Sequence, residues 1–245
     1  MNSSRSLFSP LPEPVYAAAM PAPALARTPA ILLVLAMGLV SCLGGCAGLG
    51  LRRPSGPLIT SSADGKKQLA PEFATVVYES SSIAAAEIYL TDLPPDRLLN
   101  PRDDLTGLSG SIIQIRLMIV PKAGNTPIGD TACNVTIRHI VLGTRENEAA
   151  VPPEVGVYGG GGFLYPGNTP GASSMSGSIA GGTVRPIAWT SGFVDLLGPS
   201  ELSGGFTARL DEPTSRGIKA RIQNLLSRAD QRPADQSTTI ASPKE

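Results

Sequence analysis

The sequence predicts a mainly β domain, an antiparallel β-sandwich or barrel-like fold with one C-terminal helix. Several short segments alternate apolar and polar residues, as strands with one buried face do. The 245 residues include 27 Gly and 23 Pro, which favour frequent turns over long helices. One segment near the C-terminus has helical spacing instead. We expect this single domain to span residues 71–229.

The clearest strand is expected at residues 111–120, which read SIIQIRLMIV. Alternation places four branched residues on one face: Ile113, Ile115, Leu117 and Ile119. The other face carries Gln114 and Arg116 but is also partly apolar, which predicts a central strand.

Other strands are expected on weaker patterns. Residues 134–142 and 205–210 repeat the alternation. Residues 73–79 and 83–90 are further candidates, although the alanines of the second could equally be helical. Residues 184–190 contain Pro186, which limits that segment to an edge strand.

The helix is expected at residues 212–229. Asp211 can cap it, Pro213 suits a first turn, and helical spacing continues through Ile218, Ile222, Leu225, Leu226 and Ala229. The alternatives are a helix docked on the sheet and an amphipathic helix on a membrane. We expect docking, because the strand at 205–210 ends only a few residues earlier.

The N-terminal region carries the pattern of a secretory signal. Residues 30–40 read AILLVLAMGLV, with Arg27 before them and small residues after. The segment Leu39-Val40-Ser41-Cys42 at its end resembles the lipobox of bacterial lipoproteins. The resemblance implies a signal peptide at residues 1–41 and a lipid on the Cys42 thiol. A second lipobox makes Cys46 the second choice.

This resemblance also implies a place for the protein: a membrane-anchored lipoprotein of the bacterial cell envelope, facing the periplasm or the exterior. Residues 42–70 then form a lipidated flexible tether, and residues 230–245 a disordered tail. One alternative is an uncleaved membrane helix over residues 30–51. Met20 would make a more ordinary start than Met1.

Composition excludes several classes of function. Lys and Arg number 20 against 20 Asp and Glu, so we expect no nucleic-acid partner and no polybasic membrane patch. Three Cys and one His exclude zinc ribbons and iron–sulfur clusters, and no cofactor or metal is expected. Four aspartates lack a calcium-binding spacing and are expected in a solvated loop: Asp92, Asp96, Asp103 and Asp104.

Two single residues, His139 and Cys133, have side chains that could carry chemistry. His139 shares a strand face with Val135, Ile137 and Val141, which favours a packed structural histidine over a catalytic one. Cys133 is expected to be a buried, unpaired thiol, with a disulfide to Cys46 as the alternative.

The glycine-rich residues 156–171 carry Tyr158, Phe163 and Tyr165. These rings could form a partner-binding platform on a mobile loop, for a glycan, a peptide or a protein. Alternatively, the glycines permit a bulge or tight crossing and the rings are buried.

Three functions are consistent with these observations. The leading hypothesis is a lipid-anchored envelope protein that presents a non-catalytic binding or structural β-domain, with an envelope protein or glycan as partner. A hydrolase of envelope polymers is the second, with carboxylates such as Glu87, Asp195 or Asp211. No catalytic residues are assigned. The third is an accessory subunit of a secretion or assembly complex.

Overall fold

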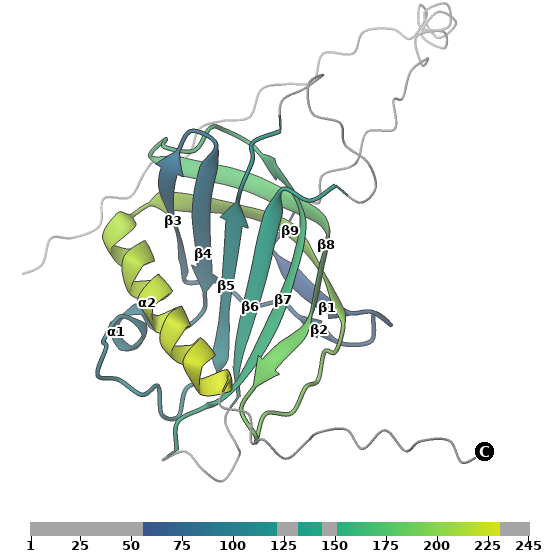
Figure 1. The fold of residues 1–245 in the computed structure, drawn as a ribbon, viewed down its shortest axis with the longest axis vertical. Helices are drawn as coiled ribbons and strands as arrows, with labels where there is room; N and C mark the ends of the chain where they lie inside the picture. Colours follow the sequence, from purple (N-terminus) through teal and green to yellow (C-terminus); the bar gives the residue numbers. More distant parts are fainter. Residues whose placement is uncertain (1–55, 122–131, 144–150, 231–245) are drawn as a thin grey trace, which may run out of the picture. The chain divides into compact units, whose positions relative to one another are not determined.

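A computed structural model describes residues 56–121, 132–143 and 151–230 (Figure 1). These residues form nine strands and two helices, and the fold is mainly antiparallel β, as predicted. The strands are β1 (Ile59–Ser62), β2 (Gln68–Leu69), β3 (Thr75–Ser82), β4 (Ala85–Thr91), β5 (Gly110–Leu117), β6 (Val135–Gly143), β7 (Glu154–Pro166), β8 (Ser174–Trp189) and β9 (Ser200–Leu210). The helices are α1 (Pro95–Leu98) and α2 (Glu212–Ala229).

The sheet closes on itself, which makes the domain barrel-like. Strands β3 to β9 pair antiparallel in chain order, and β9 then pairs in parallel with β3 at Val77–Arg209 and Tyr78–Leu210. The first half of β9 also pairs with β1, which carries β2 as a hairpin. One edge of β9 is therefore shared between β1 and β3.

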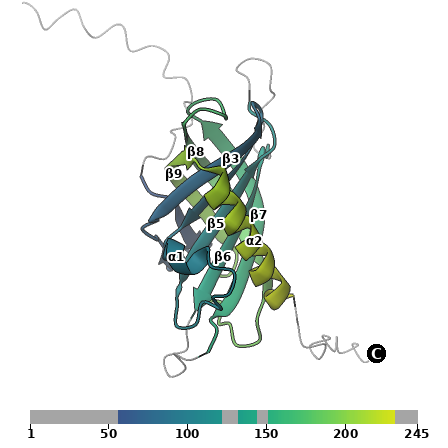
Figure 2. The same ribbon diagram turned by 90° about the vertical axis from the view of Figure 1, so that its left-hand side faces the viewer.

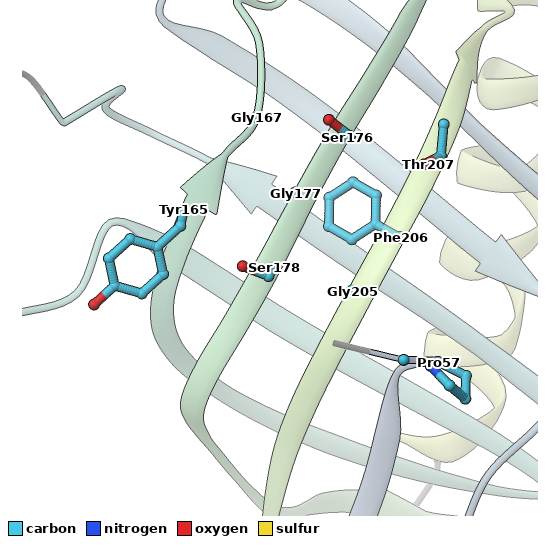
Figure 3. A pocket seen from close by; sticks show the side chains of 10 residues that line it. Pro57, Tyr165, Gly167, Ser176, Gly177, Ser178, Gly205, Phe206 and Thr207 are labelled. Carbon is cyan, nitrogen blue, oxygen red and sulfur yellow. The ribbon is translucent and has the colours of Figure 1, made fainter. Parts of the chain in front are cut away.

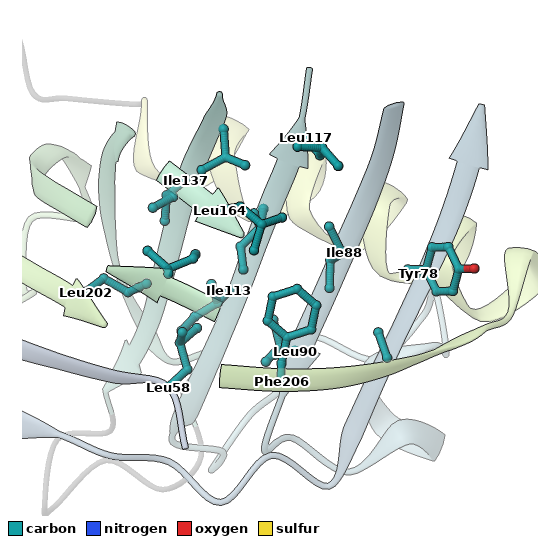
Figure 4. Close-up of a cluster of buried hydrophobic side chains, with 14 of the residues drawn as sticks. Leu58, Tyr78, Ile88, Leu90, Ile113, Leu117, Ile137, Leu164, Leu202 and Phe206 are labelled. Atoms are coloured by element: carbon teal, nitrogen blue, oxygen red, sulfur yellow. The ribbon is translucent and has the colours of Figure 1, made fainter. Parts of the chain in front are cut away.

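The first core fills the inside of the closed sheet (Figure 4). It collects one face of every strand from β3 to β9, including Ile113, Ile115 and Leu117 of β5. The alternation of residues 111–117 is thus confirmed, whereas Met118 and Ile119 lie beyond the strand and are exposed.

The second core lies on the outer face of the sheet, where α2 packs (Figure 2). Ile218, Ile222 and Leu225 of α2 are fully buried there with residues of β3 to β7. Asp211 caps the helix by accepting a hydrogen bond from the Thr214 amide at 3.1 Å. The docked helix, rather than a membrane-bound one, is therefore confirmed.

Part of the predicted tether belongs to the folded domain instead. Within residues 42–70, β1 and β2 form a hairpin, and Leu58 and Thr60 are buried. The hairpin could not be predicted from the sequence pattern, because its strands are short and rich in Ser and Thr. Its turn contains Gly65 at φ 68°, in the left-handed region that glycine favours.

The structure also assigns the two segments at residues 83–90 and 184–190, whose strand character the sequence left open. Residues 83–90 contribute β4, so the helical alternative for its alanines is wrong. Pro186 lies in β8, which has neighbours on both sides up to Val184 but pairs only with β7 at Pro186. Proline is tolerated there because that end of the strand has a free edge.

The predicted signal peptide, Cys42, Cys46 and most of the predicted tail lie outside the described residues. So does the alternative membrane segment at 30–51. Within the described part of the chain, no helix has the length and apolarity that crossing a membrane requires.

Candidate ligand-binding site

His139 lies inside the closed sheet and is completely buried. Its Nε2 lies 2.6 Å from Ser111 Oγ on β5, and its Nδ1 lies 3.1 Å from Thr60 Oγ1 on β1. Burial lowers the pKa of the imidazole to about 4, so the ring is neutral at pH 7. Ser111 is also buried, and a substrate therefore has no access to this serine–histidine pair.

The three carboxylates considered for a hydrolase have separate structural partners. Glu87 on β4 pairs with Arg116 at 2.7 Å and with Lys219 of α2 at 3.1 Å. Asp211 caps α2. Asp195 lies in the loop between β8 and β9, where it accepts hydrogen bonds from the Tyr158 hydroxyl and the Gly198 amide.

The protonation of Glu87 also argues against acid catalysis. Burial would raise the pKa of this carboxyl, but hydrogen bonds from Tyr89, Arg116 and Lys219 lower it to about 2. A general acid for glycoside hydrolysis needs a raised pKa, so that it holds a proton near neutral pH. Glu87 is ionised over that range and forms an ion pair instead.

The three aromatic residues of the glycine-rich segment do not form a loop platform. Most of that segment is strand β7 rather than a mobile loop. Tyr158 is buried inside the sheet, whereas Phe163 and Tyr165 pair with each other at 4.8 Å between ring centroids. Because successive residues of a strand point to opposite faces, Tyr158 shares the inner face with Leu164, whereas Phe163 and Tyr165 take the alternate positions.

The most apolar cavity described lies between the β1–β2 hairpin and the loop from β8 to β9. We call it the hairpin pocket, and its volume is about 490 Å³. Seven of its lining residues are apolar or aromatic: Leu69, Val141, Tyr158, Phe193, Val194, Leu196 and Leu197. Small-molecule sites in proteins have this size and this predominance of apolar lining.

Tyr158 and Asp195 hold the loop that forms one wall of the hairpin pocket. The buried Tyr158 hydroxyl donates to Asp195, whose carboxylate also accepts from the amides of Leu197 and Gly198. Burial would raise the pKa of Asp195, but these hydrogen bonds lower it, so the carboxylate stays ionised. The loop is thereby anchored to the inner core at one point.

Gly156 of β7 leaves room for the same loop to pack against the sheet. A Cβ on Gly156 would overlap the Phe193 ring, so only glycine at this position of β7 lets the ring pack there. Phe193, Leu197 and Val141 pack against the inner core from the pocket side. The hairpin pocket is thus continuous with the inner core.

The rim of the hairpin pocket combines apolar and cationic side chains. Val194 and Leu196 are 70% and 61% exposed. Lys66 and Lys67 also line the pocket; Lys66 forms a long ion pair of 3.5 Å with Asp64, and Lys67 helps to lower the pKa of Asp195 by charge attraction. The pocket therefore offers an apolar interior with positive charge at its mouth.

A second cavity lies over β8 and β9 (Figure 3). Glycines form much of its lining, and the Tyr165 ring points away from Phe206. The buried Ser178 hydroxyl has no hydrogen-bond partner among the described residues. This cavity offers little apolar surface and no charged side chain, so it ranks below the hairpin pocket as a ligand site.

Two further expectations need correction. Cys133 is exposed rather than buried, and its thiol donates to the Val135 carbonyl at 3.0 Å. Among the four aspartates, Asp96 and Asp104 are exposed, but Asp103 forms an ion pair with Arg97 and Asp92 accepts from the Ser111 amide. In the described ranges, no group of three His, Cys, Asp or Glu side chains could hold a metal ion.

Sequence reasoning missed the hairpin pocket itself. Of its lining residues, the sequence patterns singled out only Tyr158, as a ring of a partner-binding loop, and Val141, as a neighbour of His139. The exposed apolar pair at 194 and 196 is the one signal that was readable in the sequence. Compared with protein-family models, curated proteins and solved structures, the chain matches none.

Proposed function

We propose that this chain is a lipid-anchored protein of the bacterial cell envelope whose β-domain binds a ligand without catalysing a reaction. The proposed ligand is amphipathic, with an apolar chain and an acidic head group. The observation that carries the proposal is the hairpin pocket, which is lined by seven apolar or aromatic residues and by two lysines.

The chemistry of the pocket selects this ligand class. Burying an acyl chain against Val141, Phe193 and Leu197 would remove apolar surface from water, at about 25 cal/mol for each Å². An acidic head group at the mouth would lie near Lys66 and Lys67, where charge attraction and hydrogen bonds favour it. A neutral chain of the same length would gain the burial of its apolar surface but not the attraction to the lysines.

A titration with a fluorescent long-chain fatty acid tests the proposed ligand. Saturable binding to the wild type is expected, with Val194→Asp weakening it because a charge would enter the apolar wall. Lys67→Glu should weaken binding of the acid but leave binding of its uncharged methyl ester unchanged. The control is Ile83→Asp, at an exposed position that does not line the pocket.

Two outcomes would overturn the ligand assignment. One is the lack of saturable binding by folded wild-type protein. The other is an equal effect of Ile83→Asp and Val194→Asp, which would mean that any added surface charge acts alike.

The lipid anchor is tested separately. Cells given an alkyne-bearing fatty acid should label the wild type, and Cys42→Ala should abolish that label. Loss of label only in Cys46→Ala would assign the lipid to the second lipobox. Labelling of neither cysteine would contradict the lipoprotein proposal, while leaving the ligand titration unaffected.

An accessory role in a secretion or assembly complex is a second candidate function. It is favoured by the exposure of Val194 and Leu196 on one loop, since exposed apolar side chains close together often contact a partner protein. Affinity capture of the tagged protein from membranes would test it. An envelope protein that is captured by the wild type but lost in Leu196→Asp would support this role over ligand binding.

A further inference from the structure

A groove on the outer face of the sheet gathers four basic side chains beside α2. It has a volume of about 530 Å³ and is lined by Arg116, Arg138, Arg185 and Lys219, together with Gln114 and Gln223. We call it the basic groove. It shares no lining residue with the hairpin pocket.

The register of the strands explains the arrangement of the groove. Gln114, Arg138, Gly159 and Arg185 are successive cross-strand partners on β5, β6, β7 and β8. Since neighbouring strands lie about 4.8 Å apart, the two arginines are about 10 Å apart at their backbones. Gly159 stands between them without a side chain, and the Ile187 side chain lies over it as an apolar part of the groove lining.

Two of the four basic residues already have carboxylate partners. Arg116 pairs with Glu87, and Lys219 lies 3.1 Å from Glu87 and 3.2 Å from Glu79. These pairs fix the side of the groove next to α2. They also leave the positive charge of the other side uncompensated.

Arg138 and Arg185 carry that charge. Arg138 donates one hydrogen bond to the Gln114 amide oxygen at 3.0 Å, which orients its guanidinium without neutralising it. Arg185 is exposed and has no ion pair within the described ranges. Both guanidinium groups line the groove and keep N–H donors that no ion pair within the described ranges engages.

We propose that the basic groove binds a phosphate group between Arg138 and Arg185. Guanidinium groups present paired N–H donors that match two oxygens of a phosphate. A tetrahedral group with several free oxygens can accept from two guanidinium groups at once, which a single carboxylate does less well. The phosphate could belong to a phospholipid head group or to a soluble sugar phosphate, and the experiment separates these two sources.

Calorimetric titration of the detergent-solubilised full chain with inorganic pyrophosphate is the first test. Arg138→Gln and Arg185→Gln should each weaken binding about tenfold or more, and the double variant should abolish it. Arg102→Gln is the matched control, because Arg102 is exposed and does not line the groove. It should change the affinity by less than about twofold.

A glycine variant tests the geometry without changing charge. In Gly159→Ala the new Cβ would lie 2.7 Å from Ile187 Cδ1, the end of a side chain that can move aside. The variant should fold with an unchanged melting temperature yet bind pyrophosphate more weakly, because the methyl group and the displaced Ile187 side chain narrow the groove between the arginines.

Competition then identifies the source of the phosphate. Displacement of pyrophosphate by monomeric dihexanoyl phosphatidylglycerol assigns the groove to a lipid head group, and displacement by glucose 1-phosphate assigns it to a soluble sugar phosphate. Lys67→Glu should leave pyrophosphate binding intact, so failure of this proposal is distinguishable from failure of the hairpin pocket. The proposal is overturned if folded wild type does not bind pyrophosphate, or if the double arginine variant binds it as well as Arg102→Gln does.

Discussion

Adjacent residues of β5 belong to two different cores. Ile113 points into the closed sheet, whereas Ile112 packs on the outer face under α2. The inner core is enclosed by strands that pair with one another around the whole sheet. The outer core is instead covered by one helix that follows the last strand and by the short segment around α1.

The difference shows how each core is held in place. Removing one side chain from the inner core leaves the enclosing strands paired. The outer core is covered by α2, with Leu93, Leu98 and Leu105 of the α1 segment beside it, so much of its surface on β3 to β7 would become exposed if the helix left. The following experiments test this difference, from the largest expected effect to the smallest.

Truncation at Asp211 should have the largest effect, because it removes α2 and exposes the outer core. Burial of Ile218, Ile222 and Leu225 contributes about 4.5–9 kcal/mol, at about 1.5–3 kcal/mol for each fully buried side chain. That is comparable with the whole stability of a typical domain, about 5–15 kcal/mol. The product should aggregate or unfold, as measured by solubility and thermal melting.

The control for that truncation is a chain ending at Asp230, which keeps α2 and should melt like the full chain. A soluble, cooperatively folded product ending at Asp211 would contradict the idea that the outer core needs the helix.

Single alanine substitutions should separate the two cores on β5. Ile112→Ala and Ile113→Ala should each cost about 2–5 kcal/mol, because both side chains are fully buried. Combined with Leu225→Ala, Ile112→Ala should be non-additive, since both belong to the outer core, whereas Ile113→Ala should add. Urea unfolding of the single and double variants measures their free energies of unfolding. If Leu225 showed the same coupling energy with Ile112 as with Ile113, the two cores would not be energetically separate.

Lowering the pH should weaken the inner core before the outer face. The pKa of His139 is about 4 in the fold against 6.5 for an ordinary histidine, so the unfolded chain binds a proton first as pH falls. Stability should drop by about 3 kcal/mol between pH 6.5 and 4. The Glu87 carboxyl, whose pKa falls from 4.5 to about 2, contributes stability that is lost only below pH 4.5.

Urea unfolding at pH 7, 5.5 and 4.5 should show this loss in the wild type. His139→Gln should be less stable than the wild type at pH 7, because the glutamine is a poorly paired buried polar group. Its free energy of unfolding should, however, fall less steeply as the pH is lowered, because the histidine that takes up the proton is gone. Parallel pH profiles for the two proteins would mean that His139 does not titrate as described.

Removing the cap of α2 should have the smallest effect. Asp211→Ala loses the hydrogen bond from the Thr214 amide and should destabilise the domain by about 1 kcal/mol. Asp211→Asn keeps an acceptor at the same place and should cost less. Thermal unfolding of the three proteins measures the difference, and equal melting temperatures for wild type and Asp211→Ala would show that capping adds nothing here.

Much of the fold could be predicted because its signals are local. The alternation at 111–117, the strand at 205–210 and the capped helix at 212–229 all follow from residues close in sequence. The β1–β2 hairpin was missed because its pairing partner, β9, lies about 140 residues away. No local pattern marks a four-residue strand made of Ile, Thr and Ser.

The candidate sites could not be predicted either, because their residues also come from segments that lie far apart in the sequence. The hairpin pocket brings Lys67, Val141 and Phe193 together from three distant segments. The basic groove depends on the register that places Arg138 and Arg185 on either side of Gly159. One residue of slip in that register would move the side chains to the other face.

The sequence by itself determined the fold class, the C-terminal helix and the lipobox pattern at Cys42, because periodicity and short motifs act over a few residues. Tertiary structure alone decided that the sheet closes through a parallel β3–β9 pair. It also decided that Ser111 and Thr60 meet His139. These contacts depend on strand pairing between residues far apart in the chain, whose energies exist only once the whole sheet has formed.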